Sequence, residues 1–101
     1  MNDPLLNLLG LSRRAGRVEL GFEAAKAAIR AGRACLVLAA ADLSDKTVKE
    51  LNYHAGQQKI TLIQTAHNII AISDAVGMKT GVVALTDAGL AAKALLLLKE
   101  E

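Results

Sequence analysis

The stretch AGRVELGFEAAKAAIRAGRACLVLAA, residues 15–40, decides the fold because its hydrophobic period changes twice. Residues 17–20 alternate between polar and apolar side chains, which predicts a short strand. Residues 21–31 repeat apolar positions at helical spacing, and Gly32 is typical of a helix end. The apolar positions of this helix are Phe22, Ala25, Ala28 and Ile29. The almost wholly apolar run 34–40 then predicts a central strand covered on both faces.

The alternation of helix and strand continues on both sides of this stretch. Asp3 followed by Pro4 predicts the start of an N-terminal helix. Downstream, we expect helices that begin after Ser44, after Thr65 or Asn68, and after Asp87, strands at 59–64 and 82–85, and helix ends at Gly56 and Gly77. Such alternation favours an α/β fold in which helices cover both faces of a small, mostly parallel sheet. The sequence therefore predicts a three-layer α/β/α sandwich.

The length and composition limit the kind of protein. A chain of 101 residues has room for one domain, so we expect a single domain over 1–101. The apolar residues are mostly aliphatic, and no apolar run reaches the about 18 to 20 residues that span a bilayer. The N-terminus lacks the order of a signal peptide, and the single Cys35 excludes an internal disulfide. We therefore expect a cytoplasmic protein without a membrane partner, and a buried Cys35.

The basic residues are unevenly distributed. Residues 1–33 carry six cations against three acids, whereas the rest carries six against seven. The six are Arg13, Arg14, Arg17, Lys26, Arg30 and Arg33, and they include every arginine of the chain. Because the planar arginine fork suits phosphate, this bias favours an anionic partner. We expect these residues to form one surface around Gly21.

Other chemistries find little support. The glycines match neither the dinucleotide-binding nor the P-loop pattern, so no nucleotide cofactor is expected. His54 and His67 have no third ligand at metal spacing, so no metal site is expected either. The sequence offers no set of nucleophile, base and orienting group. We therefore expect a protein that is not an enzyme and has no cofactor.

Three stretches together resemble one family. They are LLGLSRRAGRVELGFEAAKAAIRAGRACLVLAAADLSDKT (8–47), ITLIQ (60–64) and GVVALTDAGLAAKAL (81–95). In this order they are similar to the kink-turn-binding ribosomal proteins of the L-seven-Ae and L-thirty-e family, particularly its small bacterial YlxQ-type members. The resemblance implies a mixed four-stranded sheet. It also implies binding to structured RNA, typically a kink-turn with tandem sheared G·A pairs.

The resemblance also implies where RNA would bind. One element corresponds to Gly21 through Arg30, and the other is a loop before the last strand that contacts an extruded base. Gly21 matches the family pattern, whereas Glu23 and Ala27 stand where RNA-binding members have an asparagine and a lysine. The expected RNA-binding residues are Arg13, Arg14, Arg17, Gly21, Phe22, Glu23, Lys26, Ala27, Arg30, Val76, Gly77, Met78, Lys79 and Thr80.

Two functions follow from these observations. The first is non-catalytic binding of structured RNA, either ribosomal RNA or another RNA with a kink-turn, by a monomer that associates with the ribosome. The alternative is a protein-interaction module of the same fold that has lost RNA binding. Glu23, Ala27 and the nearly neutral charge after residue 33 favour the alternative.

Overall fold

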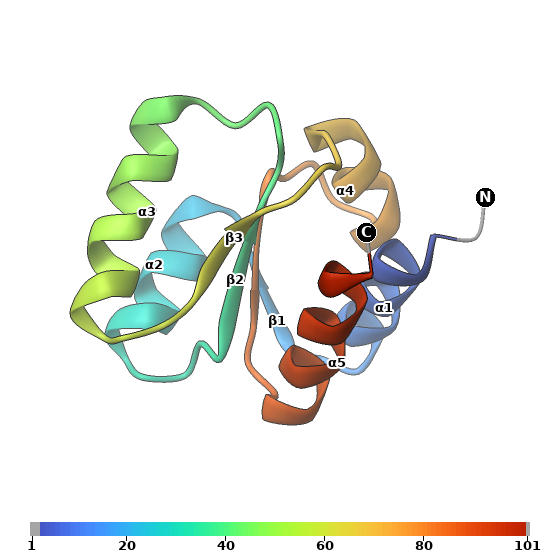
Figure 1. Cartoon of the computed structure of the whole chain (residues 1–101), viewed down its shortest axis with the longest axis horizontal. Helices are drawn as coiled ribbons and strands as arrows, with labels where there is room; N and C mark the ends of the chain where they lie inside the picture. Colours follow the sequence, from blue (N-terminus) through green and yellow to red (C-terminus); the bar gives the residue numbers. More distant parts are fainter. Residues whose placement is uncertain (1–2, 101) are drawn as a thin grey trace.

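The computed structural model describes residues 3–100, in which helices and strands alternate along the chain (Figure 1). In chain order the elements are α1 (Pro4–Arg14), β1 (Val18–Leu20), α2 (Phe22–Arg30), β2 (Leu36–Ala39), α3 (Asp45–Gln57), β3 (Leu62–Gln64), α4 (Ile69–Val76), β4 (Val82–Leu85) and α5 (Ala88–Lys99). The strands expected at 17–20, 34–40 and 59–64 are thus present as β1, β2 and β3, and each is shorter than the expected range.

The sheet lies between two layers of helices (Figure 1). Successive residues of a strand point to opposite faces, so Leu36 and Leu38 of β2 pack with α1, α4 and α5, whereas Val37 packs with α2 and α3. On the second face Ile29 and Leu51 are fully buried. Two aliphatic cores therefore cover the two faces of the sheet, and the expected three-layer α/β/α sandwich is confirmed.

The order of the strands is β1-β4-β2-β3. Strands β2 and β3 are parallel, whereas β4 is antiparallel to both β1 and β2. The mixed four-stranded sheet is confirmed, but the expectation of mostly parallel strands is wrong. The antiparallel direction of β4 results from the connection through α4 and residues 77–81. This connection returns the chain to the end of the sheet where β2 finishes, since the Ala40 N–H donates to the Gly81 carbonyl at 2.8 Å. Strand β4 must then run back.

Four helices begin at the capping side chains that predicted their starts. The carboxylates or hydroxyl of Asp3, Ser44 and Asp87, and the amide oxygen of Asn68, accept hydrogen bonds from backbone N–H groups in the first turns of α1, α3, α5 and α4. Gly56 does not end its helix, contrary to expectation. The helix continues to Gln57, and the chain turns at Lys59, which has a φ of 56°.

Cys35 is exposed, so its expected burial is wrong. The strand begins only at Leu36, and Cys35 lies at the open end of the sheet, with its N–H donating to the Leu85 carbonyl at 2.7 Å.

Candidate nucleic-acid interface

The first part of the candidate interface is the turn from β1 into α2. Gly21 has φ 93° and ψ 164°, a backbone conformation that is essentially restricted to glycine. A Cβ atom at this position would meet no atom within 4 Å, so the turn is open to an incoming molecule. No side chain caps the N-terminus of α2. The first N–H groups of the helix and the positive end of its dipole are therefore available to an anion.

The second part is the loop 77–81 between α4 and β4. Gly77 ends α4 in the left-handed conformation, with a φ of 72°. The Ser73 hydroxyl then closes the loop, since it accepts from the Thr80 N–H at 2.9 Å and donates to the Thr80 carbonyl at 3.1 Å. Met78, 48% exposed, and Lys79, also exposed, lie between these fixed ends. The loop thus presents one apolar and one cationic side chain.

The two parts meet at Val82, the first residue of β4. Its carbonyl accepts from the Gly21 N–H at 3.0 Å and from the Thr80 hydroxyl at 2.9 Å. Its N–H donates to the same Thr80 hydroxyl at 3.1 Å. Segments that are far apart in the sequence therefore lie side by side at one end of the sheet (Figure 1).

The first turns of α2 carry a small charged group. The Lys26 ammonium lies 5.4 Å from the centroid of the Phe22 ring and 3.6 Å from a Glu23 carboxylate oxygen. The Lys26 side chain is 25% exposed and the Glu23 side chain 81%. The lysine is thus held against the helix by an aromatic ring and a neighbouring carboxylate, while the carboxylate itself points outward. Ala27 and Arg30 are exposed further along the helix.

Arg13 and Arg14 lie on α1, in the helix layer opposite α2. The Arg13 guanidinium donates to the Val76 carbonyl at the C-terminus of α4. This bond satisfies a terminal carbonyl and attaches α1 to the start of loop 77–81. Arg14 lines the groove between α1 and α4 together with Asp74.

Arg17 lies at the other end of the sheet. Its carbonyl accepts from the Thr86 N–H at 2.9 Å, just beyond β4, whereas Gly21 is bonded to the first residue of β4. Arg33 follows the C-terminal end of α2, whereas Gly21 precedes its N-terminal end, and the Arg33 guanidinium is 3.9 Å from a carboxylate oxygen of Glu19. The six cations therefore do not surround Gly21. The structure brings Lys26 beside it and Arg13 beside the neighbouring loop.

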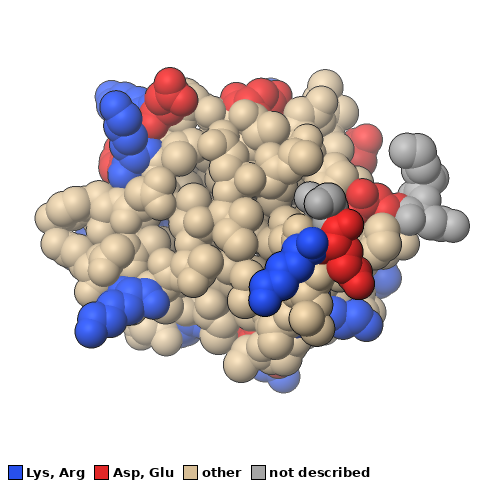
Figure 2. All heavy atoms as spheres, viewed as in Figure 1, with Lys and Arg blue, Asp and Glu red and all other residues tan. Residues whose placement is uncertain are grey.

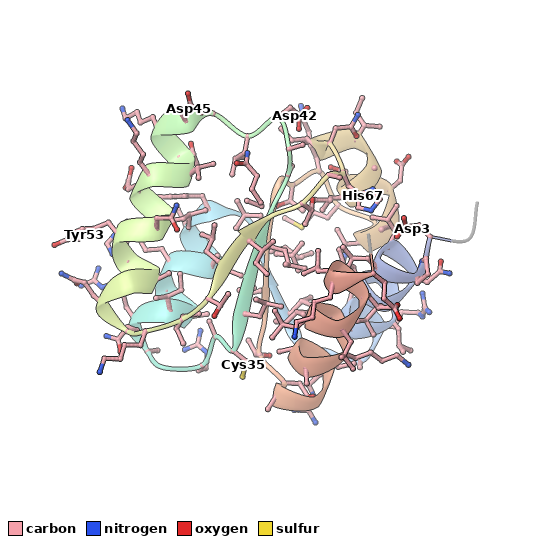
Figure 3. The ribbon with its side chains drawn as sticks, in the orientation of Figure 1. Asp3, Cys35, Asp42, Asp45, Tyr53 and His67 are labelled. Atoms are coloured by element: carbon pink, nitrogen blue, oxygen red, sulfur yellow. The ribbon has the colours of Figure 1, made fainter. Side chains whose placement is uncertain are left out.

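The histidines have local partners. In Figure 3 the side chains of His67 and Asp3 approach each other, and the His67 Nε2 lies 3.2 Å from a carboxylate oxygen of Asp3. The ring of His54 stands edge-on to that of Tyr53 at 5.3 Å. Among residues 3–100, no three His, Cys, Asp or Glu side chains come together as metal ligands. None of the helices in that range has the length and apolarity to cross a membrane.

Two residues of this region escaped the sequence interpretation. Ser73 closes the loop, and Val82 connects the Gly21 turn to loop 77–81, but neither residue was expected in the interface. A signal for Ser73 exists: it is a small polar residue four positions before Gly77, on a helix that is otherwise apolar apart from Asp74. Val82 acts through its backbone, which no side-chain pattern reveals.

Comparisons with known proteins place the chain in a family. The model of the ribosomal protein L7Ae/L30e/S12e/Gadd45 family matches residues 3–95. The large ribosomal subunit protein eL30B of Schizosaccharomyces pombe is 30% identical over 89 residues, which cover 86% of this chain and 76% of that protein. The eL30 protein of Dictyostelium discoideum is 30% identical over 83 residues, covering 80% of this chain and 74% of that protein.

Solved structures agree with this placement. A Bacillus halodurans protein of unknown function superposes with a TM-score of 0.91 and 28% identity, over 97% of this chain and 99% of that one. The 15.5kD RNA binding protein of Giardia lamblia has the same fold, with a TM-score of 0.79, 19% identity and coverage of 99% and 89%. From the family match and these relatives, the chain belongs to the ribosomal protein L7Ae/L30e/S12e/Gadd45 family.

Proposed function

We propose that the protein binds structured RNA of the kink-turn type at the end of the sheet where Gly21 meets loop 77–81. The observation that carries this proposal is the Val82 carbonyl, which accepts hydrogen bonds from both segments, at 3.0 Å from the Gly21 N–H and 2.9 Å from the Thr80 hydroxyl. Membership of a family of ribosomal and RNA-binding proteins supports the same partner.

In this proposal the two segments do different work. At Gly21 the RNA backbone approaches the exposed N-terminus of α2, where helix N–H groups and Lys26 meet phosphates. Loop 77–81 places Met78 against an extruded base, because unstacked bases are recognised by contact with side chains. The distorted shape of the RNA is therefore read more than its sequence.

We further propose that the protein acts without catalysis or a cofactor, in the cytoplasm and in association with the ribosome. The ribosomal relatives support this role, since the two matched eL30 proteins are named as parts of the large subunit.

A binding titration over a range of salt tests the proposal. The probe is an RNA with a kink-turn, and the matched control replaces its sheared G·A pairs with Watson–Crick pairs. We expect tighter binding to the kink-turn and an affinity that falls as salt rises, because phosphate contacts release counterions. Equal affinity for both RNAs would remove kink-turn recognition, and the absence of binding at low salt would remove the RNA function itself.

The second candidate is a protein-interaction module that has lost RNA binding. The Glu23 carboxylate favours it, since it lies 3.6 Å from the Lys26 ammonium and is 81% exposed beside Gly21. A pull-down treated with nuclease separates the two candidates. Partners of an interaction module survive the treatment, whereas those recruited through RNA are lost.

A further inference from the structure

Strand β3 is an open edge of the sheet. It lies at the end of the order β1-β4-β2-β3 and pairs only with β2 among the described strands. Figure 1 looks directly onto this edge: β3 runs in front of the sheet, with α3 on one side and α5 on the other, and neither helix crosses it. The backbone of β3 is therefore accessible from outside.

The outward backbone groups of β3 can be identified from its pairing with β2. The Thr61 carbonyl accepts from the Val37 N–H at 3.0 Å, and the Thr65 N–H donates to the Ala39 carbonyl at 2.8 Å. Because backbone groups alternate in direction along a strand, the N–H and C=O groups of Leu62 and Gln64 point away from β2. These four groups form a short template for another strand.

The segment around this template is free of charge. From Ile60 to Ser73 the chain contains no Lys, Arg, Asp or Glu. Edge strands are usually protected from pairing by charged side chains, as at the opposite edge, where Glu19 of β1 lies 3.9 Å from Arg33. Figure 2, in the same view as Figure 1, shows most charged atoms around the margin of the face and one blue and red group right of its centre, whereas the surface over β3 is largely uncharged.

An apolar groove runs beside β3 on the side of α5. It has a volume of about 340 Å³ and includes Ile63, Leu95 and Leu98 in its walls, with Lys99 as its charged residue. Ile63 is half-buried and packs on the core of this face, so part of its side chain remains open to the groove.

We propose that β3 pairs with β3 of a second copy of this chain, in antiparallel orientation about a two-fold axis at Ile63. Around this axis Leu62 of one copy lies opposite Gln64 of the other. Each such pair exchanges two N–H···O=C bonds, so all four outward groups of both copies are satisfied. The two Ile63 side chains meet at the centre, and an uncharged segment meets itself without repulsion.

The paired strands are only three residues long, so the interface is smaller than the about 800 Å² on each partner that stable complexes bury, and we expect a weak association that depends on concentration. The pairing leaves the Gly21 turn accessible, because that turn follows β1 at the opposite edge of the sheet. Self-association and RNA binding are therefore separate properties. The monomer expected from the sequence would be the dilute form of a concentration-dependent dimer.

Two substitutions at one position test the backbone pairing. Gln64→Pro removes an outward N–H that β2 does not use, and Gln64→Ala removes the same side chain but keeps the N–H. In sedimentation experiments from about 1 µM to 1 mM, concentrations that bracket weak and moderate association, we expect the mass of wild type and Gln64→Ala to approach double. Gln64→Pro stays at the monomer mass while its circular dichroism and RNA affinity remain those of wild type. A wild type that stays monomeric, or a Gln64→Pro variant that still dimerises, overturns the proposal.

Cross-linking tests the register without relying on the stability of Gln64→Pro. In a Cys35→Ser background, Ile63→Cys places two thiols at the axis, where the facing Cα atoms of a non-hydrogen-bonded pair are about 4.5 Å apart. Thr61→Cys is the control, because its two copies would lie about 13 Å apart along the strands. Rapid oxidation to a disulfide-linked dimer is expected for Ile63→Cys alone. Equal rates for both variants, or cross-linking only through residue 61, contradict the register. Wild type that captures another protein but never itself would assign this edge to a different partner and exclude self-pairing.

Discussion

The two parts of the candidate interface are neighbours, but different interactions hold them in place. Loop 77–81 is fixed by hydroxyl groups, including that of Thr80, which is only 6% exposed. The turn at Gly21 is held by a backbone bond, and the charges that follow it, Glu23 and Lys26, are on the helix surface. The loop therefore supplies a fixed shape, whereas α2 supplies charge that surrounding ions can screen.

This difference separates the expected effects of substitutions. A change that disturbs the shape lowers RNA affinity at every salt concentration. A change that removes a phosphate contact lowers the slope of log affinity against log salt by about 0.7 to 0.9. The following experiments use both readouts.

The largest effect is expected at Gly21, whose N–H donates to the Val82 carbonyl where the two parts meet. Gly21→Ala forces a side chain into a conformation with φ 93°, which costs about 1 to 3 kcal/mol of folding free energy. The added methyl group also points into the open space that the RNA backbone would enter. We expect a loss of about 100-fold in RNA affinity, equivalent to about 2.7 kcal/mol, in the kink-turn titration.

Gly16→Ala is the matched control for this substitution. Gly16 has a φ of 71° and, like Gly21, has no atom within 4 Å of an added Cβ, but it lies in the turn between α1 and β1. It should lower stability by about 1 to 2 kcal/mol and leave RNA affinity unchanged. Equal losses of affinity in both variants would indicate that the effect comes from stability alone.

A smaller loss is expected from Thr80→Val, which separates the loop from the turn. The substitution leaves the buried Val82 N–H without its hydroxyl acceptor, at a cost of about 1 to 3 kcal/mol in a denaturant titration. RNA affinity should fall about tenfold, or about 1.4 kcal/mol, with the salt slope preserved. Thr65→Val is the control, since it removes a buried hydroxyl that bonds the Ala39 carbonyl and the His67 N–H at the end of β3, which β2 separates from β4. If its RNA affinity falls equally, the loop is not the cause.

Arg13 and Arg14 compare shape with charge on adjacent residues of α1. Arg13→Gln removes the donor to the Val76 carbonyl, so the start of loop 77–81 loosens, and we expect a loss of about threefold to fivefold, or up to about 1 kcal/mol, with little change in salt slope. Arg14→Gln removes the same charge without this bond. Any phosphate contact of Arg14 therefore appears as a lower slope. If Arg13→Gln lowers the slope as well, Arg13 contacts phosphate directly.

The sequence predicted the elements of the fold better than their directions. Capping side chains such as Asp3 and Ser44 act within one turn of the residues they bond, so local patterns reveal them. The direction of β4 depends on where α4 and loop 77–81 return the chain, which is a tertiary property. Gly56 was misread because a glycine in a helix and a glycine after one look alike in the sequence.

The candidate site was predictable to a similar degree. The resemblance indicated Gly21 and loop 77–81, and the structure brings the two together. The resemblance could not indicate that Arg13 faces a helix terminus or that Arg17 lies at the other end of the sheet. The two arginines are close in the sequence, but the turn between α1 and β1 separates them in space. The role of Ser73 depends on its hydrogen bond with the Thr80 N–H, and the geometry of this bond cannot be read from the hydrophobic pattern of the sequence.

The smallest effect, at Glu23, is also the most informative about the charge of α2. Glu23→Gln removes a carboxylate that is 81% exposed and 3.6 Å from Lys26, so stability should change by no more than about 0.5 kcal/mol. If phosphates approach α2, removing this repulsion should raise RNA affinity about threefold at low salt, and the gain should shrink near 0.15 M salt, where the screening length is about 8 Å. Glu19→Gln, in the middle of β1 and beside Arg33, is the control and should leave the affinity unchanged. An affinity that falls in Glu23→Gln with an unchanged salt slope would reverse the assignment, because the carboxylate would then accept a hydrogen bond from a base, and the helix would read the RNA as well as attract it. A fall with a lower slope would instead show that the carboxylate positions Lys26 for a phosphate.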